Sequence, residues 1–254
     1  MTTQRIADTD LTFTSQGEGR PYVLLHGGAG PRSMTGFAEA LAASGDAQVI
    51  VPTHPGFDST PRPDWLDSFG GLARLYDALL AELELDDAIV VGNSVGGWIA
   101  AEVALLGSER LAGVVLLNEG GIDVPDAPVA NAFALSRDEI TALSYHDPEP
   151  FRRALAELPE AQQAMMAANF GTLRAYNAAS DAGIFPSLAG IKVPTLVAWG
   201  ESDGLYPPQY GRALAAAIPG AQFELIAGAG HLPQLETPAA LLRLLKDFSS
   251  RHPL

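Results

Sequence analysis

The sequence predicts an α/β protein with a mostly parallel sheet flanked by helices. Short apolar segments rich in β-branched residues alternate along the chain with segments that carry apolar residues at helical spacing. Several apolar segments run directly into glycine-rich loops, as strands do where the chain turns into a helix. With 254 residues, 47% of them hydrophobic, the chain can form one large domain of this class or two small ones.

The apolar pattern locates the individual elements. One or two antiparallel edge strands are predicted near the N-terminus, where Ile6, Leu11 and Phe13 stand among polar residues. Further strands are predicted over residues 22–25, 48–51, 88–91, 113–117, 195–199 and 222–226. Helices are predicted over residues 33–43, 68–85, 95–106, 209–218 and 237–248. The last helix should begin with Thr237 as its N-cap and Pro238 at its first position.

Residues 119–186 are predicted to form a helical lid inserted into the sheet domain. This segment has no convincing strand, is rich in alanine and is interrupted by prolines. Helices are expected in it over residues 136–145, 149–158 and 160–179. The core domain would then consist of residues 1–118 and 187–254.

The segment Gly92-Asn93-Ser94-Val95-Gly96 has the G-x-S-x-G pattern. It lies between a predicted strand and a predicted helix, which is the context of a nucleophile elbow. Glycine is needed at both ends of the pattern because the strand and helix backbones approach each other closely at such a turn. Ser94 would then stand at the head of the sheet, and the Val95 amide at the helix N-terminus would face a developing oxyanion.

Two further loops carry residues that could activate Ser94. A serine hydroxyl is a poor nucleophile unless a base accepts its proton. His231 lies in a glycine-rich loop after the last predicted strand, and Asp203 lies in the loop after the strand at 195–199. Because the C-terminal ends of parallel strands meet at one edge of a sheet, these residues are predicted to form a Ser–His–Asp triad.

The loop His26-Gly27-Gly28-Ala29-Gly30 follows the first buried strand. Four small residues in succession leave backbone amides uncovered, which is typical of an anion-binding nest. The alternative interpretation is a flexible loop without a ligand.

As a set, these segments resemble the α/β-hydrolase fold superfamily over essentially the whole chain. The resemblance rests on Leu25–Gly28, Pro55–Phe57, Gly92–Gly97, Trp199–Asp203 and Gly230–Pro233. It implies an eight-stranded, mostly parallel sheet with a lid inserted after the sixth strand. It also implies that Ser94 is the nucleophile, His231 the base and Asp203 the acid.

The resemblance implies further site residues. The second oxyanion donor, beside Val95, would be the amide of Gly28, with Ala29 in its place if the loop is shifted by one residue. His26 and His54 would tie loops together and take no part in catalysis. Candidate substrate contacts are Ala29, Trp98, Phe133, Met165, Met166, Phe170 and Leu232. The aromatic and methionine residues of the lid are more simply explained as the lid's own core.

The amino-acid composition limits the classes of ligand and cofactor that the protein is expected to bind. The formal net charge of −15 argues against nucleic acid and anionic membranes, so a small-molecule substrate is expected. The chain has no cysteine, and its five histidines show no paired spacing, so neither a metal nor another cofactor is expected. No signal peptide or membrane span is visible, and a cytoplasmic location is expected. The sequence does not predict an oligomeric state.

Three functions fit the pattern to different degrees. The triad favours a cofactor-free serine hydrolase that cleaves a small, largely apolar ester through an acyl-enzyme on Ser94. The elbow also resembles that of carbon–carbon bond hydrolases of the meta-cleavage type, although Leu232-Pro233-Gln234 stands where an aromatic residue is expected after the histidine. For such a substrate, the lid offers arginines that could hold a carboxylate: Arg137, Arg152, Arg153 and Arg174. A non-catalytic ligand-binding protein on the same fold would have no need of an intact triad.

Overall fold

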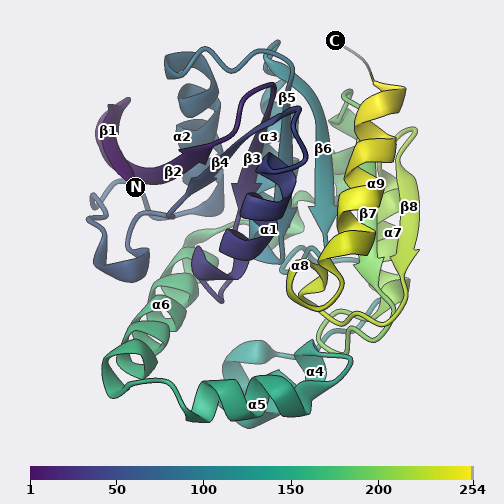
Figure 1. Ribbon diagram of the computed structural model, residues 1–254. Helices are drawn as coiled ribbons and strands as arrows, with labels where there is room; N and C mark the ends of the chain where they lie inside the picture. The colour runs from purple at the N-terminus through teal and green to yellow at the C-terminus, as the bar shows by residue number, and fades with distance from the viewer. Residues whose placement is uncertain (253–254) are drawn as a thin grey trace.

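The computed structural model describes residues 1–252, in which eight strands form one sheet with helices on both faces (Figure 1). The strand order is β1-β2-β4-β3-β5-β6-β7-β8. β2 pairs antiparallel with β1 and with β4, and all other neighbours are parallel. The predicted fold class is therefore confirmed, including the antiparallel strands at the N-terminal edge.

The strands lie close to their predicted positions. They are β1 (Thr2–Ile6), β2 (Thr9–Gln16), β3 (Arg20–Leu25), β4 (Ala47–Pro52), β5 (Ala88–Asn93), β6 (Leu111–Leu117), β7 (Thr195–Gly200) and β8 (Gln222–Ile226). The helices of the sheet domain are α1 (Arg32–Ala42), α2 (Phe69–Glu82), α3 (Val95–Leu106), α7 (Pro208–Ala217), α8 (Pro233–Glu236) and α9 (Pro238–Arg251), with a short 3-10 helix η1 (Phe57–Ser59).

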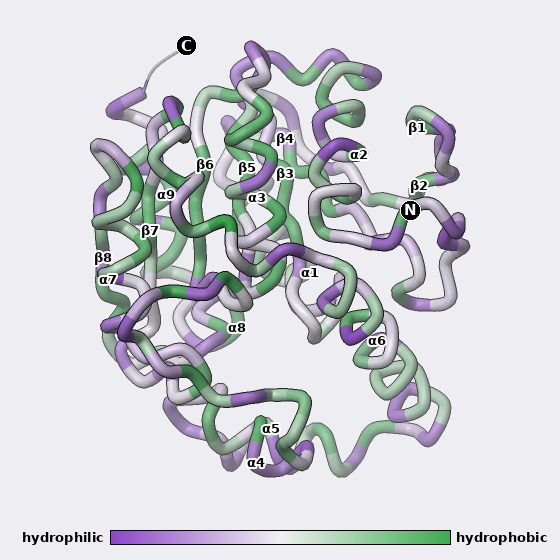
Figure 2. The backbone as a smooth tube through the Cα atoms, turned by 180° about the vertical axis from the view of Figure 1, so that it is seen from behind, coloured by the Kyte–Doolittle hydropathy of each residue, from purple (hydrophilic) through white to green (hydrophobic). Residues whose placement is uncertain are grey.

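The sheet separates two apolar cores. Alternate residues of each strand point to opposite faces, so Val90 of β5 packs with α2 and α3 while its neighbours Ile89 and Val91 pack with α1 and α9. Both faces are covered, which explains why the inner strands are continuous apolar runs without a polar side (Figure 2). All six residues of β5 and all six of β7 are buried.

β5 and α3 meet at a turn that only glycine can line. A Cβ placed on Gly92 would lie 2.0 Å from the carbonyl oxygen of Gly96, and one placed on Gly96 would lie 2.2 Å from the carbonyl oxygen of Leu25. These are backbone atoms that cannot move aside. The strand-to-helix turn expected from the sequence is therefore present, and it carries Ser94 at the C-terminal edge of the sheet.

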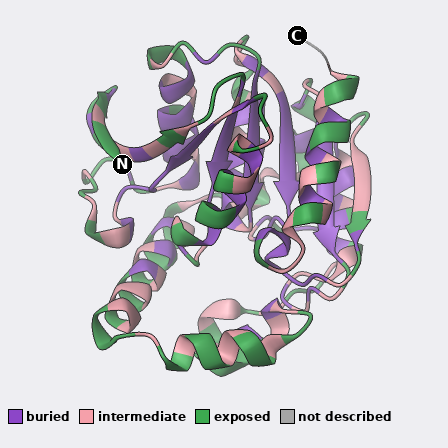
Figure 3. Cartoon of the chain, viewed as in Figure 1, coloured by how far each residue is buried: buried purple, intermediate pink, exposed green. Residues whose placement is uncertain are grey.

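Every secondary-structure element between β6 and β7 is a helix. It contains η2 (Ala132–Ala134), α4 (Arg137–Ser144), α5 (Pro148–Ala156), α6 (Glu160–Ala179) and η3 (Ala182–Gly190). We call residues 119–186 the insertion. Figure 1 shows α4 and α5 beyond the C-terminal ends of the strands. Helix α6 contacts η1. None of the residues of α5 is buried, as Figure 3 also shows, which contrasts with the buried strands.

Helix α6 attaches the insertion to the core through polar side-chain contacts. The side chains of Asn169 and Asp58 are joined by an Nδ2–Oδ1 hydrogen bond of 2.8 Å, and the Asp58 amide donates to Asn169 at the same distance. The Tyr176 hydroxyl donates to the Pro55 carbonyl at 3.0 Å. These polar contacts fix α6 over the loop after β4, and Leu173 packs beside the loop after β3.

Two details of the C-terminal region differ from the prediction. The short helix α8 was not predicted, because its four residues are too few to show a periodic pattern. Thr237 does occupy the N-cap position of α9 with Pro238 after it, but its side chain does not cap the helix. The Thr237 hydroxyl instead donates backwards to the Pro233 carbonyl at 3.4 Å. Among residues 1–252, no helix combines the length and apolar character needed to cross a bilayer.

We expect Gly92→Ala to prevent stable folding, because the added methyl group would overlap the Gly96 carbonyl. The loss should exceed about 3 kcal/mol in the free energy of unfolding, measured by urea denaturation. Gly171→Ala is the matched control. Gly171 lies inside α6 with open space around its Cβ position, so alanine should stabilise the protein by about 0.5–1 kcal/mol. A soluble Gly92→Ala variant with unchanged stability would contradict this account of the turn.

Candidate active site

Ser94 occupies the turn between β5 and α3 in a strained backbone conformation. Its φ of 57° and ψ of −127° lie outside the regions that L-residues favour, as happens most often at functional sites. Its amide donates to the Leu117 carbonyl at 3.0 Å, which fixes the turn to the end of β6. The residue is only half-buried. The strain is thus maintained by the surrounding backbone, and it presents the side chain at the sheet edge.

Asp203 is held by four hydrogen bonds in the loop after β7. Its Oδ1 accepts from the amides of Leu205 at 2.9 Å and Tyr206 at 3.0 Å. Its Oδ2 accepts from Asn118 Nδ2 at 2.7 Å and faces His231 Nδ1 at 2.8 Å. Only 3% of the residue is exposed. A buried carboxylate is tolerated when its oxygens are satisfied in this way, and the four partners fix its orientation.

His231 is oriented by this carboxylate. Because an ionised carboxylate can only accept, the hydrogen between Asp203 Oδ2 and His231 sits on Nδ1, which leaves Nε2 unprotonated in the neutral ring. The ring of Tyr206 stacks on the imidazole with the centroids 5.6 Å apart and the planes 26° apart. His231 therefore has the tautomer and the support that a general base requires.

Asn93 connects the nucleophile turn to the base loop. Its Nδ2 donates to the carbonyls of Leu117 at 3.1 Å and His231 at 2.9 Å, and its Oδ1 accepts from Gln234 Nε2 at 3.0 Å. The structure thus brings the three predicted triad positions to one edge of one sheet. The Asp203–His231 bond is formed, whereas a direct bond between Ser94 Oγ and His231 is not among those of residues 1–252. Such contacts often tighten only when substrate binds.

The loop after β3 passes directly over the serine. A Cβ on Gly27 would lie 2.8 Å from the Cβ of Ser94, so the loop backbone is as close as it can be. Val95 is the first residue of α3, where an amide has no acceptor within its helix. Gly28 sits next along the loop, beneath the side chain of Leu173. This arrangement is compatible with the predicted oxyanion donors, whose role remains a prediction.

His26 and His54 form a buried pair that fixes this loop. The His26 ring accepts from the His54 amide through Nε2 at 3.1 Å and donates to the Gly27 carbonyl through Nδ1 at 2.8 Å. His54 donates through Nε2 to the His26 carbonyl at 2.8 Å and accepts through Nδ1 from the Tyr76 hydroxyl. Every ring nitrogen is used by the neutral tautomers. Both histidines therefore have the structural role expected from the sequence.

Burial keeps this pair uncharged. Removal from water lowers the pKa of His26 to about 4, against a smaller opposite effect of its bond to Gly27. Burial also lowers the pKa of His54 well below its usual value, and the nearby His26 acts in the same direction. The loop over Ser94 is consequently fixed by neutral hydrogen bonds at physiological pH.

Glu119 is a fully buried carboxyl group just behind the elbow. Burial raises its pKa to about 8, so the protonated form dominates at neutral pH. The geometry agrees, because the Tyr210 hydroxyl lies 3.0 Å from Glu119 Oε2 and 2.9 Å from the Ile122 carbonyl. One hydroxyl has a single hydrogen, so both contacts are satisfied when Glu119 donates to Tyr210 and Tyr210 donates to Ile122.

The prediction of Trp98 as a substrate contact is wrong. Its ring is fully buried, packs against Phe69 with centroids 4.8 Å apart, and donates through Nε1 to Glu102 at 2.8 Å. The reason is that every residue in the first half of α3, from Val95 to Ala101, is buried, so the Trp98 ring is enclosed by the core. The remaining candidate contacts stay predictions; they are Ala29, Phe133, Met165, Met166, Phe170 and Leu232.

Sequence reasoning missed several polar residues that hold the site. They are Asn118, the first residue after β6, and Gln234 and Glu236, which lie on α8. The place of Asn118 in the sequence could have indicated a role in the site, because this residue directly follows a buried strand at the edge where ligand sites form. Nothing local indicated that Asn118 would reach Asp203, which is 85 positions away in the chain.

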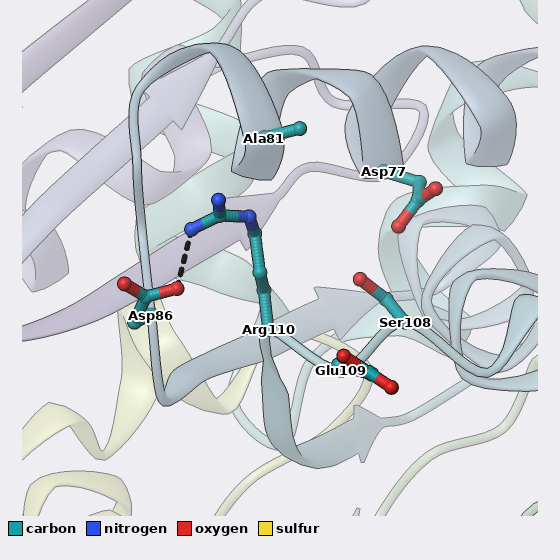
Figure 4. A pocket seen from close by; sticks show the side chains of 6 residues that line it. All are labelled: Asp77, Ala81, Asp86, Ser108, Glu109 and Arg110. Carbon is teal, nitrogen blue, oxygen red and sulfur yellow. Dashed lines mark hydrogen bonds and ion pairs between the residues drawn. The ribbon is translucent and has the colours of Figure 1, made fainter.

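A separate cavity of about 460 Å³ lies at the opposite edge of the sheet, where α2 and α3 end (Figure 4). Its lining consists of Asp77, Ala81, Asp86, Ser108, Glu109 and Arg110. Figure 4 shows Arg110 directed at Asp86, with which it forms an ion pair. None of these residues belongs to the triad loops, and within residues 1–252 no cluster of histidine and carboxylate side chains suits a metal ion.

Comparison with known proteins places the chain in a family. The profile of the alpha/beta hydrolase family matches residues 22–244. The chain is 28% identical to 2-hydroxy-6-oxo-6-phenylhexa-2,4-dienoate hydrolase of Burkholderia cepacia, over 94% of this chain and 90% of that protein. It is 30% identical to 2-hydroxymuconate semialdehyde hydrolase of Pseudomonas putida, over 92% of this chain and 88% of that protein.

A solved structure adds a second kind of relative. Est816, described as an N-acyl homoserine lactone degrading enzyme, is 28% identical to this chain and superposes with a TM-score of 0.76. The match covers 97% of this chain and 99% of Est816. The protein therefore belongs to the alpha/beta hydrolase family and is a hydrolase. The sequence relatives favour the carbon–carbon bond alternative over the ester hydrolase that the sequence alone put first.

We expect Asp203→Asn to abolish most of the reactivity of Ser94. The amide would present a donor to either His231 or Asn118, so the imidazole would lose its orienting acceptor. By analogy with other triads, the rate of Ser94 labelling by a fluorophosphonate should fall about 10³- to 10⁴-fold. Asp64→Asn, an exposed carboxylate in the loop before α2, is the charge-matched control. Labelling of Asp203→Asn within a few-fold of the parent would show that Asp203 does not orient the base.

We also expect the buried His26 to make the folded protein less stable at low pH. The unfolded state binds a proton near pH 6.5 and the folded state only near pH 4, so the free energy of unfolding falls as the pH drops through this window. For His26 alone the loss approaches about 3 kcal/mol. Urea denaturation at several pH values should show this slope, and His26→Asn should reduce it. An equal slope in the variant would contradict the assignment.

Proposed function

We propose that this protein is a serine hydrolase that cleaves the carbon–carbon bond beside the keto group of a 2-hydroxy-6-oxo-dienoate. The observation that carries the hydrolytic mechanism is the Asp203–His231 hydrogen bond next to the strained Ser94 turn. The substrate class is supported by two relatives, matched over nearly their full lengths, whose names describe hydrolases of such compounds.

The proposed reaction proceeds through an acyl-enzyme. Ser94 Oγ adds to the C6 carbonyl carbon while its proton passes to His231 Nε2. The amides of Gly28 and Val95 would donate to the resulting oxyanion, each contributing roughly 3 kcal/mol to the transition state by analogy with measured donors. Cleavage needs the 2-oxo-3-ene tautomer, which forms when the proton of the C2 hydroxyl is transferred to C5. The C5–C6 bond then breaks, its electron pair passes through the C3–C4 double bond into the oxo group at C2, and the resulting dienolate takes the proton that His231 holds. Water, with its proton taken by His231, releases the acid from Ser94.

This substrate class requires a feature that an ester does not. A carbanion leaves readily only if it is conjugated, and the conjugated fragment carries a carboxylate that must be held in place. Of the arginines expected for this purpose, Arg152 is paired with Asp138 and Glu149. Arg174 lies at the aromatic pair Phe133–Phe170, where its guanidinium stands 5.5 Å from the Phe133 ring centroid. Arg174 donates to the Phe133 carbonyl at 2.9 Å and is in none of the ion pairs of residues 1–252, so we favour it over Arg152 as the carboxylate partner. Arg137 and Arg153 stay predictions.

The insertion would act as the lid over the substrate. Its helix α6 is fixed beside the loop that carries the proposed oxyanion donor, and the half-buried Met165 and Phe170 lie on the same helix. Methionine and phenylalanine side chains suit a large conjugated substrate because they provide polarisable apolar surface. The substrate is expected to be a free small molecule.

An ester or lactone hydrolase is the second candidate. Two observations favour it. Est816, whose description names a lactone, matches the chain as completely as the dienoate hydrolases do. In addition, Leu232 follows the catalytic histidine position where an aromatic residue is expected in the carbon–carbon bond hydrolases. The same triad would perform the ester reaction, with an alkoxide in place of the conjugated carbanion.

The two candidates are separated by parallel assays. We expect the protein to bleach the absorbance of a 2-hydroxy-6-oxo-dienoate with a kcat/KM well above that for p-nitrophenyl butyrate, and Ser94→Ala to lose both activities by at least about 10³-fold. Turnover of the ester alone would select the second candidate. Undiminished turnover of either substrate by Ser94→Ala would exclude Ser94 as the nucleophile.

A further inference from the structure

The end of helix α4 is bonded directly to the two loops that hold the base and the acid. The Ser144 carbonyl accepts from the backbone amide of His231 at 2.6 Å. One residue earlier, the Leu143 carbonyl accepts from the amide of Gly204, next to Asp203, at 2.9 Å. A segment of the insertion therefore contacts the loops of both His231 and Asp203 through backbone atoms.

The backbone of the base loop packs directly against the backbone at the end of α4. A Cβ on Gly230 would lie 2.3 Å from the Ser144 carbonyl oxygen and 2.8 Å from the Cα of Tyr145. The backbones of the base loop and the insertion thus touch at the residue before His231. Any shift of residues 143–146 must move the base loop with them, because no flexible side chain separates the two.

Glu236 closes this contact from the other side. It is the last residue of α8, five positions after the base, and its carboxylate accepts from two backbone amides. Oε2 accepts from Gly230 in the base loop at 2.6 Å, and Oε1 accepts from His146 in the insertion at 2.8 Å. The ring of His146 in turn bonds Ser202 of the acid loop at 2.8 Å. One carboxylate therefore links the base loop to the insertion.

We propose that Glu236 is a positioning residue. It keeps the imidazole of His231 placed to accept the proton of Ser94, and it makes this placement depend on the position of the insertion. The inference rests on the proposed serine mechanism. Only a carboxylate suits this place, because both groups that face it are donors and a carboxylate has an acceptor at each end. A glutamine would turn an NH₂ group toward one of the two amides, and an aspartate would fall one methylene short.

Glu236→Gln tests this proposal. The second-order rate of Ser94 labelling by a fluorophosphonate is measured for the parent, Glu236→Gln and Glu236→Asp. Glu201→Gln, an exposed carboxylate at the start of the acid loop, serves as the charge-matched control. We expect the rate to fall about 10- to 100-fold in Glu236→Gln, since a misplacement of about 1 Å costs this much. The rate in Glu201→Gln should stay within two-fold of the parent.

A double-mutant cycle with His231→Ala distinguishes positioning from general damage. If Glu236 acts through the base, adding Glu236→Gln to His231→Ala should leave the residual rate unchanged. An equal fold-loss in that background, or a rate in Glu236→Gln within two-fold of the parent, overturns the proposal.

Hydrogen exchange provides a readout that needs no reactive serine. The amides of Gly230 and His146 should exchange faster in Glu236→Gln, or in Glu236→Asp if the first variant does not fold, and remain as in the parent in Glu201→Gln. Unchanged exchange contradicts the proposal. If the parent itself is not labelled, the serine mechanism has failed, and the exchange result still decides whether Glu236 holds the base loop.

Discussion

The candidate site depends above all on the hydrogen bonds made by the carboxylate of Asp203. Two backbone amides and Asn118 occupy three of its acceptor positions, which leaves one direction open, and His231 fills it. This fixes both the place and the tautomer of the imidazole. The cost of burying the charge is offset because every oxygen is satisfied. Removing any one partner would leave the carboxylate free to turn, so the geometry is specified by the set and not by one bond.

The second constraint is steric and lies at the nucleophile. β5, α3 and the loop after β3 approach each other so closely that Gly92, Gly96 and Gly27 have no space for a side chain. This packing maintains the strained backbone of Ser94, which an isolated turn would relax. Asn93 then joins this rigid region to the base loop through its bond to the His231 carbonyl. Rigid backbone on one side and a network of side-chain hydrogen bonds on the other define the edge at which a substrate would bind.

The sequence was sufficient for the fold and for placing Ser94, Asp203 and His231 at the same edge of the sheet, because both leave local signals. Strands buried on both faces are continuous apolar runs, and the G-x-S-x-G turn, the His231 loop and the Asp203 loop each follow such a run. Trp98 was wrongly predicted to contact the substrate although it lies only four residues from Ser94, because the first residues of α3 are almost all apolar or small and pack into the core. The contacts of Asn118 and Glu236 could not be predicted, since they join residues that are 85 and 90 positions apart. Such pairs depend on how the insertion and the sheet are arranged in three dimensions.

The way in which α5 is attached has a consequence for how this scaffold can diversify. No residue of α5 is buried, and it is attached to its surroundings by the stacking of Phe151 on Tyr145 and by the ion pair between Arg152 and Asp138. The contacts that attach the insertion to the sheet domain lie elsewhere, at α6 and at the end of α4. Residues 152–158, which follow Phe151, can therefore be exchanged without removing a buried side chain, whereas Phe151 has to be kept because its partner Tyr145 lies in the segment that contacts the base loop. A library confined to this stretch should cost little thermal stability, because it replaces no buried residue.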